Sequence, residues 1–253
     1  MSEWNQRTLN SRCECHSCLA GITNQLHSTQ SHDQSLYQHI PFNQHVIDIT
    51  GGTTKCARTF IEYISNHIDQ TNHDSINHID HDIVDLTHGE HVIVEVGAGT
   101  GLVSIACSLL NNMVIATDQH PLLELLQSNV HTNINSNNNT AFNGSIDVRE
   151  LLWNNSANIE SLSHYISQHA LSHKPPQYII GSDLIYAKEC IHDLVQTYHQ
   201  LAMNTHSICY LVYISRFEWE KLFFDEMNEM GFTSVCVHTV DEIQIWKFTK
   251  PYS

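Results

Sequence analysis

The clearest regular pattern in the chain is a short apolar run at residues 92–96, which only Glu95 interrupts. A run of this length and composition is typical of a strand that is buried on both faces. Three alternating glycines follow, and apolar residues then return at the i, i+3, i+4 and i+7 positions from Leu102 to Leu109. This spacing is that of a helix with one buried face. The pattern therefore predicts a strand, a tight turn and a helix.

Strand-like and helix-like patterns alternate along most of the remaining chain. Residues 37–49 predict an edge strand or a hairpin, and further strands are expected at 113–117, 145–149, 178–186, 208–214, 233–238 and 242–248. Helical spacing is expected after Thr53 or Thr54, and from Pro121, Ile191 and Glu218. This succession predicts an α/β fold of the Rossmann-like class. Its sheet is expected to be doubly wound, mostly parallel and seven-stranded, with a C-terminal antiparallel hairpin.

Polar stretches interrupt these patterns at several places. Residues 1–35 are rich in Ser, Gln and Asn, so we expect an N-terminal extension without a fixed structure, followed by one domain over residues 36–253. Residues 69–91 and 154–175 are interpreted as polar insertions, and 133–139 as an asparagine-rich loop. The cluster from Cys13 to Cys18 suggests either a zinc site or free thiols, and its tight spacing favours free thiols.

The glycine turn predicts a ligand-binding loop. Gly97, Gly99 and Gly101 allow close backbone approach, and the free N–H groups at the start of the helix form a polar cradle. The spacing G-x-G-x-G differs from the G-x-G-x-x-G that grips a pyrophosphate. Glu95 would repel a pyrophosphate but suits the ammonium and sulfonium of S-adenosylmethionine. Asp118, at the end of the next strand, could accept the two ribose hydroxyls of an adenosine.

Two further strand ends carry side chains of interest. The strand that begins at Tyr178 ends in Asp183 and Tyr186, and the carboxyl ends of central strands line the ligand crevice of an open parallel sheet. Trp153 follows the strand at 145–149 and could either cover a flat ring such as adenine or cap the core.

The charge balance narrows the classes of partner. With 27 acidic and 11 basic residues the formal charge is −16, which argues against nucleic acid or an anionic membrane and allows a cationic partner or mere solubility. Most of the eight cysteines stand singly in apolar settings, as in reduced proteins. No leading segment resembles a signal peptide, and no apolar run is long enough to span a bilayer. We expect a cytoplasmic protein, with the nucleus as an alternative, that acts as a monomer.

Together the motifs resemble the class I, seven-β-strand S-adenosylmethionine-dependent methyltransferases, and within them the methyltransferase-like 21 group of protein lysine methyltransferases. The resemblance covers about residues 40–248 and rests on the run from Glu95 to Ile105, on Leu152-Trp153 and on the D-x-x-Y motif from Asp183 to Tyr186. It implies transfer of a methyl group to a protein lysine, with Asp183 and Tyr186 as catalytic residues. The cofactor-binding residues that it implies are Glu95, Gly97, Ala98, Gly99, Thr100, Gly101, Asp118, Gln119, Trp153, Ser182 and Asp183, with no metal.

The resemblance leaves alternatives open. Family members usually carry a tryptophan where this chain has Lys55, which would either weaken cofactor binding or face solvent. The same fold could methylate a protein histidine, an N-terminal amine or a small molecule, or serve as an inactive binding module. As the protein substrate, the family suggests elongation factors or chaperones.

Overall fold

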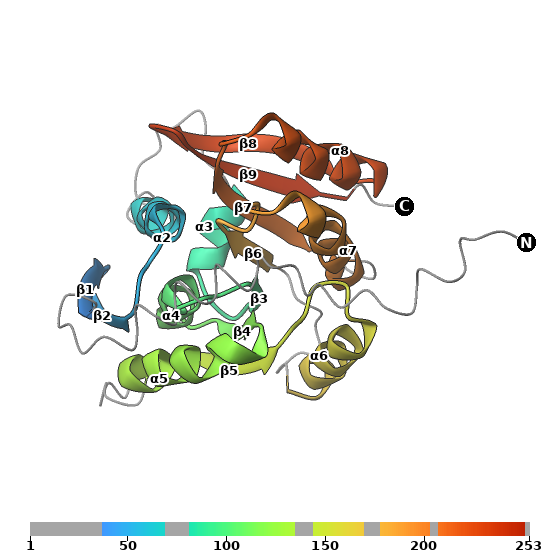
Figure 1. Ribbon diagram of the computed structural model, residues 1–253. Helices are drawn as coiled ribbons and strands as arrows, with labels where there is room; N and C mark the ends of the chain where they lie inside the picture. The colour runs from blue at the N-terminus through green and yellow to red at the C-terminus, as the bar shows by residue number, and fades with distance from the viewer. Residues whose placement is uncertain (1–36, 69–80, 135–143, 170–177, 203–206, 251–253) are drawn as a thin grey trace, which may run out of the picture.

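The computed structural model describes residues 37–68, 81–134, 144–169, 178–202 and 207–250 (Figure 1). The polar N-terminal extension and the cluster from Cys13 to Cys18 lie outside these residues. Within them, a seven-stranded sheet crosses the molecule and helices cover both of its faces.

The sheet has the strand order β5-β4-β3-β6-β7-β9-β8. Its strands are β3 (Val92–Val96), β4 (Met113–Asp118), β5 (Ser145–Glu150), β6 (Tyr178–Ser182), β7 (Ile208–Ile214), β8 (Thr233–Val240) and β9 (Ile243–Thr249). The first five are parallel, whereas β9 runs antiparallel to both β7 and β8. The predicted doubly wound sheet with a C-terminal antiparallel hairpin is therefore confirmed.

Side chains of the central strands alternate between two apolar layers. Val94 and Val96 pack with the layer of α6 (Ser156–His169), α7 (Ile191–Ala202) and α8 (Lys221–Glu229). Ile93 packs with the opposite layer, which contains α2 (Lys55–Ile68), α3 (His81–Thr87) and α4 (Leu102–Leu109). The helix α5 (Leu123–Ile134) lies beside α4 on this second face (Figure 1). Burial on both faces explains why β3 reads as a continuous apolar run.

Short 3₁₀ helices precede three of these helices: η4 (His120–Leu122), η5 (Lys188–Cys190) and η6 (Glu218–Glu220). The expected helix from Pro121 is thus η4 followed by α5, and the one from Glu218 is η6 followed by α8. Gly231, with φ of +83°, follows α8 as expected.

Two segments that we interpreted as polar insertions contain helices. Residues 81–87 form α3, where Ile83 and Leu86 are buried. Residues 156–169 form α6, whose buried residues Ile159, Leu162 and Ile166 follow the i, i+3, i+7 spacing. The prediction of loops was wrong at both places because a few apolar residues at the correct spacing bury one face of an otherwise polar helix.

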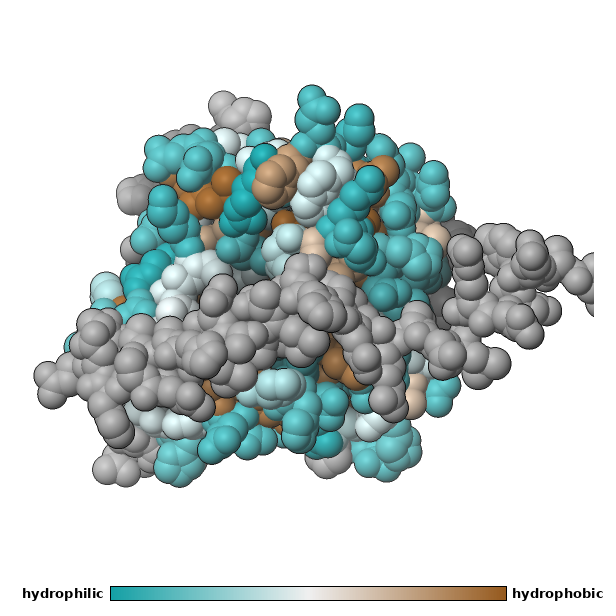
Figure 2. Space-filling model, viewed as in Figure 1, coloured by the Kyte–Doolittle hydropathy of each residue, from teal (hydrophilic) through white to brown (hydrophobic). Residues whose placement is uncertain are grey.

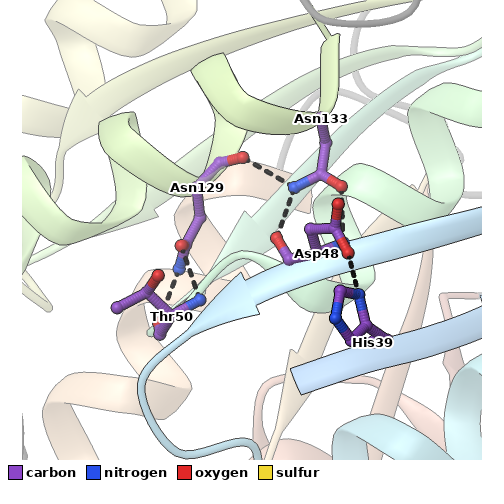
Figure 3. A network of polar contacts seen from close by, with 5 residues as sticks. All are labelled: His39, Asp48, Thr50, Asn129 and Asn133. Atoms are coloured by element: carbon purple, nitrogen blue, oxygen red, sulfur yellow. Dashed lines mark hydrogen bonds and ion pairs between the residues drawn. The ribbon is translucent and has the colours of Figure 1, made fainter. Parts of the chain in front are cut away.

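The segment at 37–49 is a hairpin of β1 (Tyr37–Phe42) and β2 (His45–Thr50), separate from the main sheet. Two asparagines of α5 bind the backbone of β2 (Figure 3). Asn133 accepts from the Asp48 N–H at 2.7 Å and donates to its carbonyl at 2.7 Å, and Asn129 does the same with Thr50 at 2.9 Å each. Asn133 is therefore a buried helical residue rather than the start of a loop.

Hydrophilic residues cover most of the described surface on the face that Figure 2 shows. Among the described residues, no helix is long and apolar enough to cross a membrane. Four cysteines of this part, Cys56, Cys107, Cys190 and Cys209, are buried.

Candidate active site

The glycine turn connects β3 to α4 and is held to the end of β4. The Ala98 N–H donates to the Thr117 carbonyl at 2.9 Å, and the Gly99 N–H donates to Oδ2 of Asp118 at 2.7 Å. No heavy atom of the described residues lies within 4 Å of a Cβ placed at Gly99, where φ is +56°. The turn thus brings its backbone to the edge of an open space.

Asp118 is the buried acid of this part of the site, with 7% of its surface exposed. Its Oδ1 accepts from the Gln119 N–H at 2.7 Å, so each carboxylate oxygen has one backbone donor. Burial raises the pKa of Asp118 to about 6, and the two backbone N–H donors oppose this rise. Because each oxygen can accept a second hydrogen bond, the carboxylate can bind a pair of hydroxyl groups.

Glu95 lies on β3 and is 1% exposed. Its Oε2 accepts from the Ser104 N–H at 2.8 Å and from the Ser104 hydroxyl, so it joins β3 to the first turn of α4. Burial raises the pKa of Glu95 to about 8, against the effect of the Ser104 hydrogen bonds. A cationic ligand near this carboxyl would favour its ionised form.

Asp183 and Tyr186 follow β6, the strand that neighbours β3 on the side opposite β4. Asp183 has a φ of +60°, so the chain turns sharply there, and its N–H donates to the Val212 carbonyl at 2.8 Å. Its Oδ1 forms an ion pair with Nη2 of Arg216 at 2.6 Å. Tyr186 is 42% exposed, and its ring centre lies 6.0 Å from that of Trp153. Trp153 therefore borders the end of the site that carries Asp183 and Tyr186.

One cavity of about 360 Å³ connects these groups. Every residue of the predicted site except Gly101 lines it: Glu95, Gly97, Ala98, Gly99, Thr100, Asp118, Gln119, Trp153, Ser182, Asp183 and Tyr186. Gly101 instead precedes α4 with φ of +85°, and a Cβ there would lie 2.6 Å from Cδ1 of Leu126. Its glycine is required by backbone geometry and packing.

The cavity also has a wall that the sequence patterns did not indicate. Gly52 and Thr54 contribute from the segment before α2, and Ala57 from its first turn. Leu122 and Leu151 add apolar surface near Asp118. Arg216 and Phe217, which follow β7, complete the side near Asp183. Their position after a strand, at the same sheet edge as Asp183, is the signal that could have identified them.

Lys55 is exposed and is not among the described residues that line the cavity. It agrees with the alternative in which this side chain faces solvent. In the described part of the chain, no three His, Cys, Asp or Glu side chains are grouped as metal ligands.

Several characterised proteins are similar to this chain. The protein N-lysine methyltransferase METTL21A of *Mus musculus* is 35% identical over 161 residues, which cover 62% of this chain and 65% of that protein. The METTL21A of *Danio rerio* is 31% identical, over 54% of this chain and 56% of that protein. The EEF1A lysine methyltransferase 3 of *Xenopus tropicalis* is 29% identical, over 62% and 63%. The chain thus matches between about half and two thirds of the length of these relatives.

Among solved structures, the 16S rRNA methyltransferase RsmC of *T. thermophilus*, in complex with AdoMet and guanosine, has a TM-score of 0.52. The alignment covers 85% of this chain and 51% of that one at 11% identity, so it supports the fold alone. The model of the lysine methyltransferase family matches residues 43–230, which is most of the chain. With this match and the sheet order found above, the chain belongs to the lysine methyltransferase family.

Proposed function

We propose that the protein transfers a methyl group from S-adenosylmethionine to the side-chain amine of a protein lysine. One observation carries the proposal: the glycine turn, the buried Asp118 and the pair of Asp183 and Tyr186 line a single cavity. A cofactor and an acceptor could therefore meet inside it. The membership of the lysine methyltransferase family supports lysine as the acceptor.

The chain's residues fit this cofactor. Asp118 would accept the ribose hydroxyls, and Leu122, Leu151 and Trp153 offer apolar surface to the adenine ring. The open space at Gly99 leaves room for the methionine part, with Glu95 as the acid near its positive charges. When bound, S-adenosylmethionine supplies an electrophilic methyl carbon on a sulfonium.

On the acceptor side, Asp183 and Tyr186 would orient the lysine amine toward that carbon. The ammonium must first release a proton to solvent, because only the neutral amine has a lone pair. A carbon–nitrogen bond then forms as the carbon–sulfur bond breaks, and the electron pair of the broken bond remains on sulfur. Positioning of the two reactants is the main contribution that we assign to the protein.

We further propose that the protein acts as a monomer in the cytoplasm. Its substrate is a protein that presents a lysine to the cavity, and the formal charge of −16 favours a basic surface around that lysine. The name of the *Xenopus* relative supports EEF1A as the first candidate for the assay.

Two experiments test the function. Isothermal titration calorimetry with S-adenosylmethionine measures cofactor binding, and labelled methyl transfer into a cell lysate and into purified EEF1A, followed by mass spectrometry, locates the modified residue. Gly99→Arg is the control, because a long side chain at this open position fills the cofactor space. We expect the wild-type protein to bind the cofactor and to label lysine, and the variant to do neither.

Other outcomes would contradict the proposal in distinct ways. Label on histidine, on an N-terminal amine or on a small molecule would show a different acceptor on the same fold. Failure of the wild-type protein to bind the cofactor would instead indicate a binding module without catalytic activity.

A further inference from the structure

The acceptor end of the cavity contains a cation beside its acid. Arg216 follows β7, and its Nη2 lies 2.6 Å from Oδ1 of Asp183, which follows the neighbouring strand β6. The Arg216 side chain is 36% exposed and that of Asp183 is 20% exposed, so both lie at the mouth of the cavity that they line. This ion pair stands where the lysine amine must approach.

Arg216 is itself held in place by a buried acid. Its backbone N–H donates to Oε2 of Glu220 at 2.8 Å, and Glu220 is 1% exposed. The other oxygen, Oε1, is buried without a hydrogen-bond partner among the described residues. A carboxyl buried with one oxygen unpaired is costly to the fold.

The ion pair leaves the Asp183 carboxylate with further positions to accept hydrogen bonds. A carboxylate has about four acceptor positions, and Arg216 uses one of them on Oδ1. Oδ2 can therefore receive the amine of the substrate while the ion pair stays intact. Arg216 restricts the rotation of the Asp183 side chain and thereby sets the direction of Oδ2.

The charges explain why a cation belongs there. An acid alone beside the lysine favours its protonated form, which cannot accept a methyl group, whereas a nearby positive charge favours the neutral amine. The groups that interact electrostatically with Arg216 are Asp183, Glu220 and Cys56, which comes from the start of α2. Burial raises the pKa of Cys56 to about 12, so this thiol carries no charge at neutral pH.

We propose that Arg216 is a positioning residue of the acceptor site, which fixes the Asp183 carboxylate through their ion pair and offsets its negative charge beside the lysine amine. The inference rests on the proposed function and adds to it a residue that acts through Asp183. Glu220 supports it by holding the backbone of the Arg216 loop.

The test is the pH dependence of the turnover number (kcat) at saturating substrate, for the full chain with Arg216→Gln and Arg216→Lys. The acid side of this profile reports the deprotonation of the bound lysine. For Arg216→Gln we expect kcat to fall about tenfold at neutral pH, with the acid limb displaced upward by about one pH unit and activity recovering in alkali. Arg216→Lys, which keeps the charge, should retain the wild-type profile and lose only part of kcat.

Cofactor affinity and the thermal unfolding midpoint are measured in parallel, and both should stay at the wild-type value. Arg149→Gln is the matched control, because Arg149 pairs with Asp147 on β5 and is not among the residues that line the cavity. It should leave kcat and the profile unchanged.

Four results would overturn the inference. The first is that Arg216→Gln leaves kcat and its pH profile unchanged. The second is that it lowers kcat by the same factor at every pH, which would indicate structural support alone. A higher kcat would show that the arginine obstructs the acceptor instead. If the wild-type protein labels no lysine, the proposed function fails and this inference fails with it.

Discussion

Asp118 and Asp183 occupy equivalent places on the two sides of β3 and are held in opposite ways. Asp118 ends β4, is buried, and receives the backbone N–H groups of Gly99 and Gln119. Asp183 follows β6, lies at the mouth of the cavity, and is paired with the side chain of Arg216. One acid is held by the main chain of the fold, and the other by a side chain from a loop.

The difference separates what the fold fixes from what individual residues fix. Backbone donors persist whatever side chains the turn carries, so the pocket around Asp118 follows from the strand, turn and helix themselves. The surroundings of Asp183 depend on the identity of residue 216 and on Glu220 beneath it. In our proposal the cofactor binds against the half of the cavity around Asp118. The protein substrate binds against the half around Asp183.

The largest effect is expected for Asp183→Ala. If Asp183 orients the amine, its loss should lower kcat by a factor of about 100 or more, with cofactor affinity and folding unchanged. Single-turnover methyl transfer measures the loss of rate, and calorimetry measures the affinity for the cofactor. Asp225→Ala, at an exposed position of α8, is the control. Wild-type turnover in Asp183→Ala would contradict the proposal that Asp183 orients the lysine amine.

Asp118→Ala should produce the reverse pattern. Loss of hydrogen bonds to a charged group would weaken cofactor binding about 10- to 100-fold, while kcat at saturating cofactor should stay within about threefold. Calorimetry and steady-state kinetics measure the split. An equal fall in kcat at saturation would show that the two aspartates do not divide the work as we describe.

Asn129→Ala tests how much the contacts of α5 stabilise the half of the cavity around Asp118 and the glycine turn. Besides its two hydrogen bonds with Thr50, Asn129 donates to the Thr100 carbonyl in the glycine turn at 2.9 Å. Its removal leaves the buried Thr100 carbonyl and the backbone of Thr50 without these partners, so the free energy of unfolding should fall by about 2 kcal/mol. Denaturant unfolding measures this loss. Ser128→Ala, at the exposed neighbour on α5, should change the stability far less.

Glu95→Gln is expected to have a smaller effect, which depends on pH. The pKa of Glu95 is about 8 in the folded chain and about 4.3 when unfolded, so the folded state keeps a proton that the unfolded state releases. Stability without cofactor should therefore fall as pH rises from about 4 to 8. The variant avoids this fall while keeping an acceptor for Ser104.

Thermal unfolding of the cofactor-free proteins checks this expectation. The two midpoints should agree below about pH 4, and the midpoint of the variant should exceed that of the wild type by an increasing amount as pH rises toward 8. Glu124→Gln, an exposed change in α5, should show no such divergence. Parallel pH curves for Glu95→Gln and the wild type would contradict the buried, protonated state of this carboxyl.

Most of the sheet, and the part of the cavity lined by the glycine turn, Asp118 and Asp183, could be predicted from the sequence. The apolar run of β3, the glycines after it, and acids at the ends of β4 and β6 are local signals, and parallel strands bring their carboxyl ends to one edge. These local patterns were therefore enough to predict that Asp118 and Asp183 line one pocket.

The remainder depends on contacts that no local pattern records. Asn129 and Asn133 bind β2 across 79 and 85 residues of chain. No local sequence pattern indicates which partner an asparagine in a helix will bind. Arg216 pairs with Asp183 across 33 residues in the same way. The helix α6 was missed for a different reason, because three buried residues among many polar ones give a weak periodic signal.

The reversed direction of β9 determines where one exposed turn lies, and thereby where the sequence can tolerate changes. Because Ile243 pairs with Ile214, the turn at Asp241 and Glu242 lies at the sheet edge where the Arg216 loop begins. That turn joins two outer strands and is exposed. Its length and charge can be altered without disturbing the five parallel strands, so this edge of the sheet, beside the Arg216 loop, tolerates substitution and insertion.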